Sequence, residues 1–274
     1  MKFGKGLSRL AFLLVALLVI TAWIQQMVLE RSLSSQMRKA LTVSGDSSQS
    51  LASGSAIKLL GTDDTVSVKE MRSTLKRANV EREDSYLIWT FRKIEGASAT
   101  AMGTDRQHHF VNAFLEGYRP FWVDHPWMPL YAIAMRLKYQ PDTQQYAGLR
   151  DVWQTSRQAF FNTRGDCEDH AILLADWLIG CGIEARVIVG TIPTGGHAWV
   201  VVFMEGQEFL LEATSKRKRR QWSHYPLASL TSGYTPTIMF DRDSFWMYTG
   251  PPGFNSYSGD HWEKRSRFYT GRGF

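Results

Sequence analysis

Apolar residues between positions 167 and 182 follow a helical pattern. Residues 171–178 contain few polar side chains, and Gly180 and Gly182 are residues that commonly end a helix. Asp166 can cap the first N–H groups, and Asp169, three residues later, has the spacing of a capping box. Positions three and four residues apart form one stripe, which contains Cys167, Ala171, Leu174 and Leu178. We therefore predict a helix that begins at Cys167 and buries the face on which this cysteine lies.

The following segment has the pattern of β-strands. Residues 185–190, 197–204 and 207–213 are short and rich in β-branched or large apolar side chains. Glu205 and Gly206 can form a two-residue hairpin turn between the second and third of these strands. In that register, His197 and Glu212 lie on the same face of the sheet. A three-residue turn would shift the register by one and send them to opposite faces.

Three side chains on these elements form a set suited to nucleophilic catalysis. The unpaired N–H groups and the dipole at a helix start stabilise negatively charged sulfur, so Cys167 is placed as a thiolate nucleophile. His197 would hold the proton as the base and later deliver it to a leaving group. Glu212 would fix the imidazole tautomer and stabilise its cation. The pattern predicts a Cys-His-Glu triad for acyl transfer.

Other interpretations of these residues stay open. Cys167 also fits a buried structural cysteine with an acidic cap. His170, one helical turn further on, fits a packed or exposed helix residue better than a base. The backbone N–H of Cys167 is a candidate oxyanion donor. For the second donor, Asn162 and Trp153 are the upstream candidates.

Several linked motifs carry a family resemblance. They are residues 151–155 (DVWQT), 163–171 (TRGDCEDHA), 182–187 (GIEARV) and 197–200 (HAWV). In this order they resemble the transglutaminase-like superfamily, and within it the bacterial transglutaminase-like cysteine proteases, over roughly residues 130–215. The resemblance implies a papain-like α+β fold, with the nucleophile helix packed on an antiparallel sheet, and a Cys-His-Asp triad. Cys167 and His197 carry over directly, and Glu212 stands where the family usually has Asp.

The resemblance also points to a candidate calcium site. Some members bind calcium through acids near the cysteine, and Asp166, Glu168 and Asp169 would be the corresponding residues. Helix capping and surface solvation explain these acids as well. The sequence has no zinc-type ligand spacing, so we expect no other metal and no organic cofactor.

The N-terminus combines a basic start with a long uncharged run. Lys2, Lys5 and Arg9 come first, and residues 10–29 carry no charged side chain. This favours an uncleaved anchor in residues 1–30 of a single-pass inner-membrane protein, with the remaining chain in a periplasm-like space. A cleaved signal peptide is the alternative. The net charge is +6 and the pI 9.3, but no nucleic-acid-binding motif is present, so we expect no nucleic-acid partner.

Composition divides the rest of the 274-residue chain. We predict a spacer at residues 31–84, serine-rich at 44–55, a catalytic domain at 85–250 and an aromatic-rich tail at 251–274. The aromatic side chains of the C-terminal part are expected to cover the core or its rim, and a substrate groove is the alternative. Within these ranges we predict a strand at 86–91, helices at 109–118 and 129–137, and a surface helix at 68–82. The basic run at 216–220 reads as a solvated loop, or as a contact to anionic lipid or an acidic substrate.

Together these patterns predict a membrane-anchored enzyme that acts on a protein or peptide substrate. Its reaction would be thiol-dependent hydrolysis of a peptide or isopeptide bond. Transglutaminase-type cross-linking passes through the same acyl-enzyme and differs only in having an amine as acceptor. A noncatalytic binding module on the same fold is the alternative from a different class.

Overall fold

The computed structural model describes residues 4–42, 54–61, 64–83, 85–91, 96–123, 127–215, 226–253 and 256–270. The chain divides into two compact units, Met1–Asp46 and Ser47–Phe274. The basic run at 216–220 and most of the serine-rich stretch at 44–55 lie outside the described residues.

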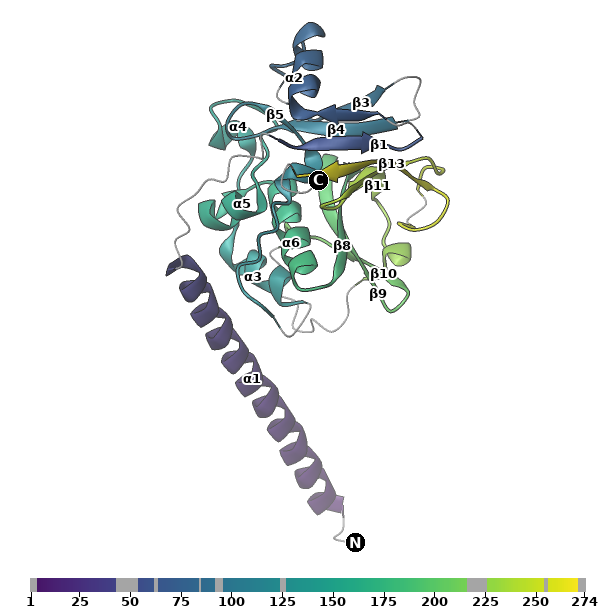
Figure 1. Ribbon diagram of the computed structural model, residues 1–274. Coiled ribbons are helices and arrows are strands. Elements are labelled where there is room, and N and C mark those ends of the chain that lie inside the picture. The colour runs from purple at the N-terminus through teal and green to yellow at the C-terminus, as the bar shows by residue number, and fades with distance from the viewer. Residues whose placement is uncertain are drawn as a thin grey trace. The chain divides into compact units, whose positions relative to one another are not determined.

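The first unit is the helix α1 (Gly4–Thr42, 39 residues), drawn in purple in Figure 1. Its stretch Leu14–Leu33 has 20 residues and a mean hydropathy of 1.4, and no position of its 18-residue apolar window is buried. Among the described helices, α1 is long and apolar enough to cross a membrane, by a criterion that a signal sequence also meets. The helix extends beyond residue 30, where the predicted anchor ends, because the residues that follow are mostly good helix formers.

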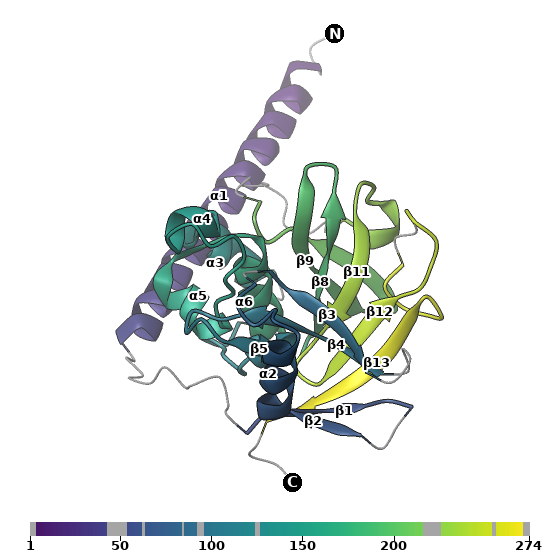
Figure 2. The ribbon, with the colours of Figure 1, turned by 90° about the horizontal axis from the view of Figure 1, so that it is seen from above.

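The second unit is built on an eight-stranded sheet in the order β10-β9-β8-β11-β12-β13-β1-β2. Every neighbouring pair in this sheet is antiparallel. The strands are β1 (Ala56–Leu59), β2 (Thr65–Ser67), β8 (Glu184–Ile192), β9 (Gly195–Met204), β10 (Gln207–Leu211), β11 (Thr235–Phe240), β12 (Ser244–Tyr248) and β13 (Trp262–Tyr269). The order of β8, β11, β12 and β13 can be followed in Figure 2.

Two small sheets and several helices complete this unit. One sheet joins β3 (Leu87–Phe91), β4 (Gly96–Met102) and β5 (His108–Phe110), and the other pairs β6 (Lys138–Tyr139) in parallel with β7 (Arg164–Gly165). The helices are α2 (Val68–Arg77), α3 (Met128–Arg136), α4 (Asp142–Gln145), α5 (Ser156–Asn162) and α6 (Cys167–Gly180), with 3-10 turns η1 (Val111–Phe114) and η2 (Ala228–Leu230). Figure 2 shows α3, α5 and α6 grouped on one side of the sheet. The unit is therefore a mixed helix and antiparallel-sheet fold.

Helix α6 is the central helix, and it packs against β8 and β9. The predicted helix and its end at Gly180 are confirmed. The predicted one-sided stripe is wrong, because residues 168–178 are buried on every face while Cys167 itself stays partly exposed. Such all-round burial is typical of a helix enclosed by neighbouring elements.

Asp176 fixes α6 to three other segments. Its carboxylate accepts hydrogen bonds from Tyr118 N (2.7 Å) and Ser156 Oγ (2.5 Å), and Arg242 Nε lies 2.6 Å from it. The Asp176 side chain is fully buried. Burial raises the pKa of Asp176, and the charge of Arg242 opposes that rise. A buried charge paired in this way holds the helix in one position.

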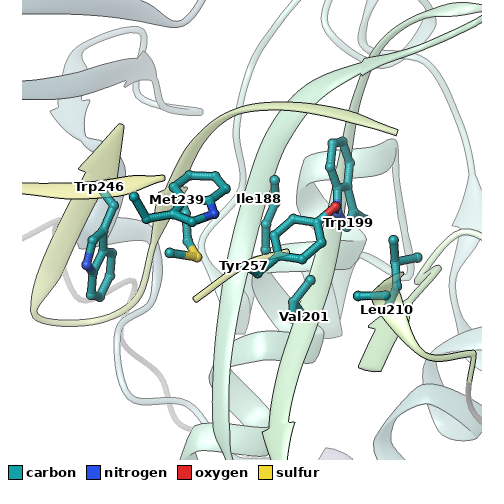
Figure 3. Packing of buried hydrophobic residues seen from close by; sticks show 9 residues of the cluster. Ile188, Trp199, Val201, Leu210, Met239, Trp246 and Tyr257 are labelled. Atoms are coloured by element: carbon teal, nitrogen blue, oxygen red, sulfur yellow. The ribbon is translucent and has the colours of Figure 1, made fainter. Parts of the chain in front are cut away.

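Aromatic side chains from the C-terminal part fill the sheet's own core cluster. The cluster contains Ile188, Trp199, Val201, Leu210, Ala228, Met239, Trp246, Tyr257 and Trp262. Figure 3 shows Tyr257 beside Trp199, with its oxygen directed toward the indole, whose N–H donates to it at 3.2 Å. The prediction that these aromatic side chains cover the core is confirmed for Tyr257 and Trp262. The segment 251–274 is no separate tail, because β13 is paired on both sides within the sheet.

The predicted spacer at 31–84 needs a similar correction. β1 and β2 lie in this range and belong to the eight-stranded sheet, with β1 paired to β13. Helix α2 follows at once, capped by Ser67, whose side chain accepts from Glu70 N at 3.2 Å. Its sparse apolar residues, Val68, Met71 and Leu75, are buried against this end of the sheet. The helix predicted at 68–82 is thus confirmed as α2, although it ends at Arg77. The strands β1 and β2, of four and three residues, gave too little local signal, because β1 joins the sheet through β13, about two hundred residues away in sequence.

Three other local predictions had different outcomes. The helix at 129–137 is confirmed as α3, and the strand at 86–91 is confirmed as β3. The helix at 109–118 is wrong, because these residues form the end of β5, the η1 turn and irregular chain. Asn112 is fully buried there and donates to Asp241 O and Ser244 O at 2.7 and 2.9 Å. These tertiary hydrogen bonds outweigh the helical preference that the spacing of apolar residues at 109–118 indicated.

Candidate active site

Cys167 is the first residue of α6, and the chain reaches it through a tightly fitted turn. Asp166 occupies the N-cap position with φ −104° and ψ −146°, and its side chain makes no capping bond. The predicted capping box is wrong, because the Asp169 carboxylate accepts from Gln154 N at 2.7 Å and from Gln154 Nε2 at 2.5 Å. A Cβ at Gly165 would lie 2.2 Å from Asp169 Oδ2, so only glycine leaves room for this arrangement.

The β9–β10 hairpin positions His197 and Glu212. Glu205 and Gly206 form its two-residue turn with φ angles of 52° and 73°, the sign that a type I′ turn requires. Met204 faces Gln207, so the predicted register is confirmed. His197 and Glu212 accordingly meet, with His197 Nε2 2.8 Å from Glu212 Oε2.

Glu212 is held by three further contacts. Its Oε1 accepts from Thr214 N at 3.1 Å and from Thr214 Oγ1 at 2.6 Å, and its Oε2 accepts from Tyr234 Oη at 3.0 Å. Burial raises the pKa of Glu212, but the hydrogen bonds with His197 and Thr214 outweigh burial and lower it. Glu212 is therefore a carboxylate in a fixed orientation. Tyr234 was missed in the sequence, where nothing links it to a residue 22 positions earlier.

The His197 ring connects this carboxylate to the cysteine. Burial lowers the pKa of His197, but side-chain hydrogen bonds with Cys167 and Glu212, with the charges of both, raise it to about 10. Because Nε2 faces Glu212, Nδ1 is the ring nitrogen left for the sulfur. The ring stacks on Trp199, two residues along β9, at 6.2 Å and 23°. The pKa of His197 thus responds to both Cys167 and Glu212, and the carboxylate is in direct contact with the ring.

The other sequence candidates lie in different environments. The Trp153 indole N–H donates to Asp151 Oδ1 at 2.6 Å, and Asn162 Nδ2 donates to Gln154 Oε1 at 2.6 Å. The Trp153 indole N–H and one of the two amide N–H groups of Asn162 are therefore engaged by other residues. His170 is fully buried, and its ring lies 6.2 Å from that of Tyr139.

Four carboxylates gather beside Cys167, and we call them the acid cluster: Asp142, Asp166, Glu168 and Asp169. One ligand atom from each lies within 4.8 Å of the others. Asp142, Glu168 and Asp169 are buried. Burial, and then the charge of Asp166, raise the pKa of Asp142 to about 8. Burial and neighbouring negative charges likewise raise the pKa values of Glu168 and Asp169.

The acid cluster has free coordinating capacity and touches the sulfur. Oδ1 of Asp142, Oδ1 of Asp166 and Oε1 of Glu168 are buried without a hydrogen-bond partner among the described residues. Glu168 Oε2 lies 3.3 Å from Cys167 Sγ. Asp142 was missed in the sequence because it comes from α4, which the β6–β7 pairing brings to the start of α6.

Comparison with known proteins gives partial matches. Residues 151–251, which include Cys167, His197 and Glu212, match a family described as CEP76 peptidase-like domain. The chain is 47% identical over 55 residues to Centrosomal protein of 76 kDa from Mus musculus, covering 20% of this chain and 8% of that protein. It is 35% identical over 75 residues to human Protein CC2D2B, covering 27% and 5%. The chain therefore spans less than a tenth of the curated relatives it matches.

Among solved structures, the chain is similar to Legionella pneumophila LapG (EGTA-treated). That similarity has a TM-score of 0.37 and 17% sequence identity, and it covers 52% of this chain and 76% of LapG.

Proposed function

We propose that the second unit is a peptidase-like enzyme with a papain-like, transglutaminase-like core. In this proposal Cys167, His197 and Glu212 carry out thiol-dependent hydrolysis of a peptide or isopeptide bond in a protein or peptide substrate. The observation that supports it most strongly is the His197 ring, which is bonded to Glu212 at 2.8 Å and whose pKa is raised by both Cys167 and Glu212. The match to a peptidase-like domain over residues 151–251 agrees with this proposal.

The proposed mechanism assigns each residue a step. The Cys167 thiolate attacks the acyl carbonyl, and the imidazolium of His197 delivers its proton to the leaving amine. Water then attacks the thioester while His197 takes up a proton. Glu212 holds Nε2 of His197 in a hydrogen bond, which fixes the orientation of the ring, and it stabilises the imidazolium cation. The backbone N–H of Cys167, at the start of α6, is one donor to the oxyanion.

Cysteine alkylation and product analysis test this function. We expect iodoacetamide to modify Cys167 faster than Cys181, whose thiol pKa is raised by burial. With a p-nitrophenyl ester, wild-type chain should release p-nitrophenol, and the Cys167→Ala variant should not. Mass spectrometry with and without an added primary amine separates hydrolysis from cross-linking. A wild-type chain no more active than Cys167→Ala would contradict the enzyme and favour a binding module.

We also propose that the acid cluster binds calcium. The residues fit the ion, because calcium is coordinated by several oxygen ligands, and here four carboxylates converge with three buried oxygens unpartnered among the described residues. The three acids named from the sequence gain Asp142 as a fourth member. Bound calcium would offset the mutual repulsion of these charges. Asp166 and Glu168, on either side of Cys167, would then hold the start of α6 in place.

Calcium should therefore stabilise the full chain measurably. At a free concentration of one hundred times Kd, a ligand that binds only the folded state adds about 2.7 kcal/mol, which raises Tm by roughly 5–10 °C for a domain of this size. Thermal unfolding in calcium and in EGTA measures the difference. Asp142→Asn, which keeps the side-chain shape and removes one charge, should lose most of the shift, whereas Asp243→Asn on an exposed turn should keep it. An equal Tm in calcium and EGTA would contradict the site.

We propose that α1 anchors the chain as a single-pass inner-membrane protein, with the enzyme unit on the periplasmic side. Support comes from the apolar stretch Leu14–Leu33 and the basic residues that precede it. Alkaline extraction of membranes from expressing cells should leave the chain in the pellet. Protease added to intact cells should degrade the enzyme unit only after the outer membrane has been permeabilised. Release into the alkaline supernatant would show that α1 is no anchor.

A further inference from the structure

Tyr139 lies beside the nucleophile and has no part in the steps above. It is the second residue of β6, and it stands opposite Gly165 of β7 in the parallel pairing. Lys138 N donates to Thr163 O at 2.8 Å, and Gln140 N donates to Gly165 O at 2.9 Å. These two bonds fix the backbone on both sides of Tyr139 against the strand that leads into Cys167.

The side chain of Tyr139 covers the first turn of α6. Its ring lies 6.2 Å from the ring of His170 at an angle of 55°. His170 is three residues after Cys167, and residues at that spacing are neighbours on one side of a helix. Tyr139 nevertheless keeps 47% of its surface exposed. Its ring thus lies beside the first turn of α6, the turn that begins with Cys167, and is half open to an approaching substrate.

The surroundings of Tyr139 keep its hydroxyl protonated. Burial of the phenol has the largest effect on its pKa, and the negative charges of Cys167, Asp166 and Glu168 have the next largest. Each of them raises the pKa of Tyr139, which lies well above its ordinary value. The interaction with Cys167 is the largest of the charge effects. A phenol that stays protonated is a hydrogen-bond donor throughout the working pH range.

The indole N–H of Trp153 and one amide N–H of Asn162, the two upstream candidates for second oxyanion donor, are bonded to Asp151 and Gln154. We propose that the Tyr139 hydroxyl is the second donor to the oxyanion that forms when Cys167 attacks an acyl carbonyl, beside the backbone N–H of Cys167. This inference rests on the proposed function. It makes Tyr139 a catalytic residue whose contribution appears only where negative charge develops on the carbonyl oxygen.

Acylation of Cys167 needs no reactant other than the acyl substrate. The sulfur–carbon bond forms as the carbonyl π pair moves to oxygen, and Tyr139 donates a hydrogen bond without transferring its proton. The pair then returns to reform the carbonyl, the bond to the leaving group breaks, and His197 supplies the proton that the leaving group takes. Tyr139 is protonated before and after.

Two reactions of the same cysteine test this role. Acylation of the full chain by p-nitrophenyl acetate passes through an oxyanion, whereas alkylation by iodoacetamide displaces iodide at a saturated carbon and forms none. Tyr139→Phe should acylate roughly 10²-fold more slowly, the usual cost of one lost oxyanion donor, and alkylate at the wild-type rate. Tyr146→Phe, a matched loss of a phenol on the chain just after α4, should leave both rates unchanged.

The outcomes separate this inference from the proposed function. Unchanged acylation in Tyr139→Phe, with wild-type acylation dependent on Cys167, overturns the role of Tyr139 alone. An equal slowing of both reactions also overturns it, because the tyrosine would then act on the sulfur or on the local structure. A wild-type chain that shows no Cys167-dependent acylation overturns both proposals.

Discussion

Replacing His197 with alanine should reduce turnover of an acyl substrate on the order of 10⁴- to 10⁶-fold, the scale reported for removing the base of a comparable triad. The reason is that the pKa of His197, raised to about 10 by Cys167 and Glu212, keeps it as the proton-carrying partner of the sulfur at neutral pH. Steady-state kinetics on the full chain, with p-nitrophenyl acetate and then a peptide substrate, measure the loss.

The matched control for this variant is His261→Ala, which removes another partly buried histidine, just before β13. We expect the turnover of His261→Ala to differ from that of wild type by no more than about twofold, since substitutions away from such a site usually have small effects. Alkylation of Cys167 by iodoacetamide should also slow in His197→Ala and not in the control. Turnover in His197→Ala close to that of wild type would leave the imidazole without a catalytic role.

Glu212→Gln should cost roughly 10²- to 10⁴-fold in turnover, although the side chain keeps its size and most of its contacts. Oε1 would stay with Thr214, which donates to it twice. The new amide nitrogen would then replace Oε2 and donate to Nε2 of His197. That forces the ring proton onto Nδ1, the nitrogen that faces Cys167, so the neutral ring can no longer accept the proton of the thiol.

The control for Glu212→Gln is Glu184→Gln, at an exposed carboxylate on β8 that pairs with Arg186. We expect no more than a twofold change there, because exposed ion pairs contribute little. The two variants should also differ by NMR, with the His197 pKa lowered only in Glu212→Gln. Equal turnover in both variants would show that Glu212 does not orient the ring.

The parts of the site that could be predicted depend on local rules. Helix periodicity placed Cys167 at the start of α6, and a two-residue turn with alternating strands placed His197 and Glu212 on one face. These rules use only residues within a few positions of one another. The identity of the turn at Glu205 and Gly206 was enough to fix a contact between side chains 15 residues apart.

The parts that could not be predicted depend on distant pairings. Tyr139 and Asp142 come to the start of α6 through the two-residue pairing of β6 with β7, which is too short to leave a sequence pattern. Tyr234 reaches Glu212 from the chain just before β11. Asp169 fits a capping box in sequence, yet it binds Gln154 because the tight turn at Gly165 directs it inward. In each case a tertiary contact displaced the local preference.

We infer that Cys167, His197 and Glu212 form one hydrogen-bonded set. Titration of the His197 ring is the most direct test of this arrangement. The seven histidines of the full chain would be labelled and followed by NMR, with His197 assigned from the His197→Ala spectrum. Because the pKa of His197 is raised on folding, the stability that its protonated ring contributes is complete below about pH 6.5 and is lost as the pH rises toward 10. We expect a His197 pKa of about 10 that falls in Cys167→Ala. A ring that titrates at or below about 6.5, as burial alone dictates, would contradict it.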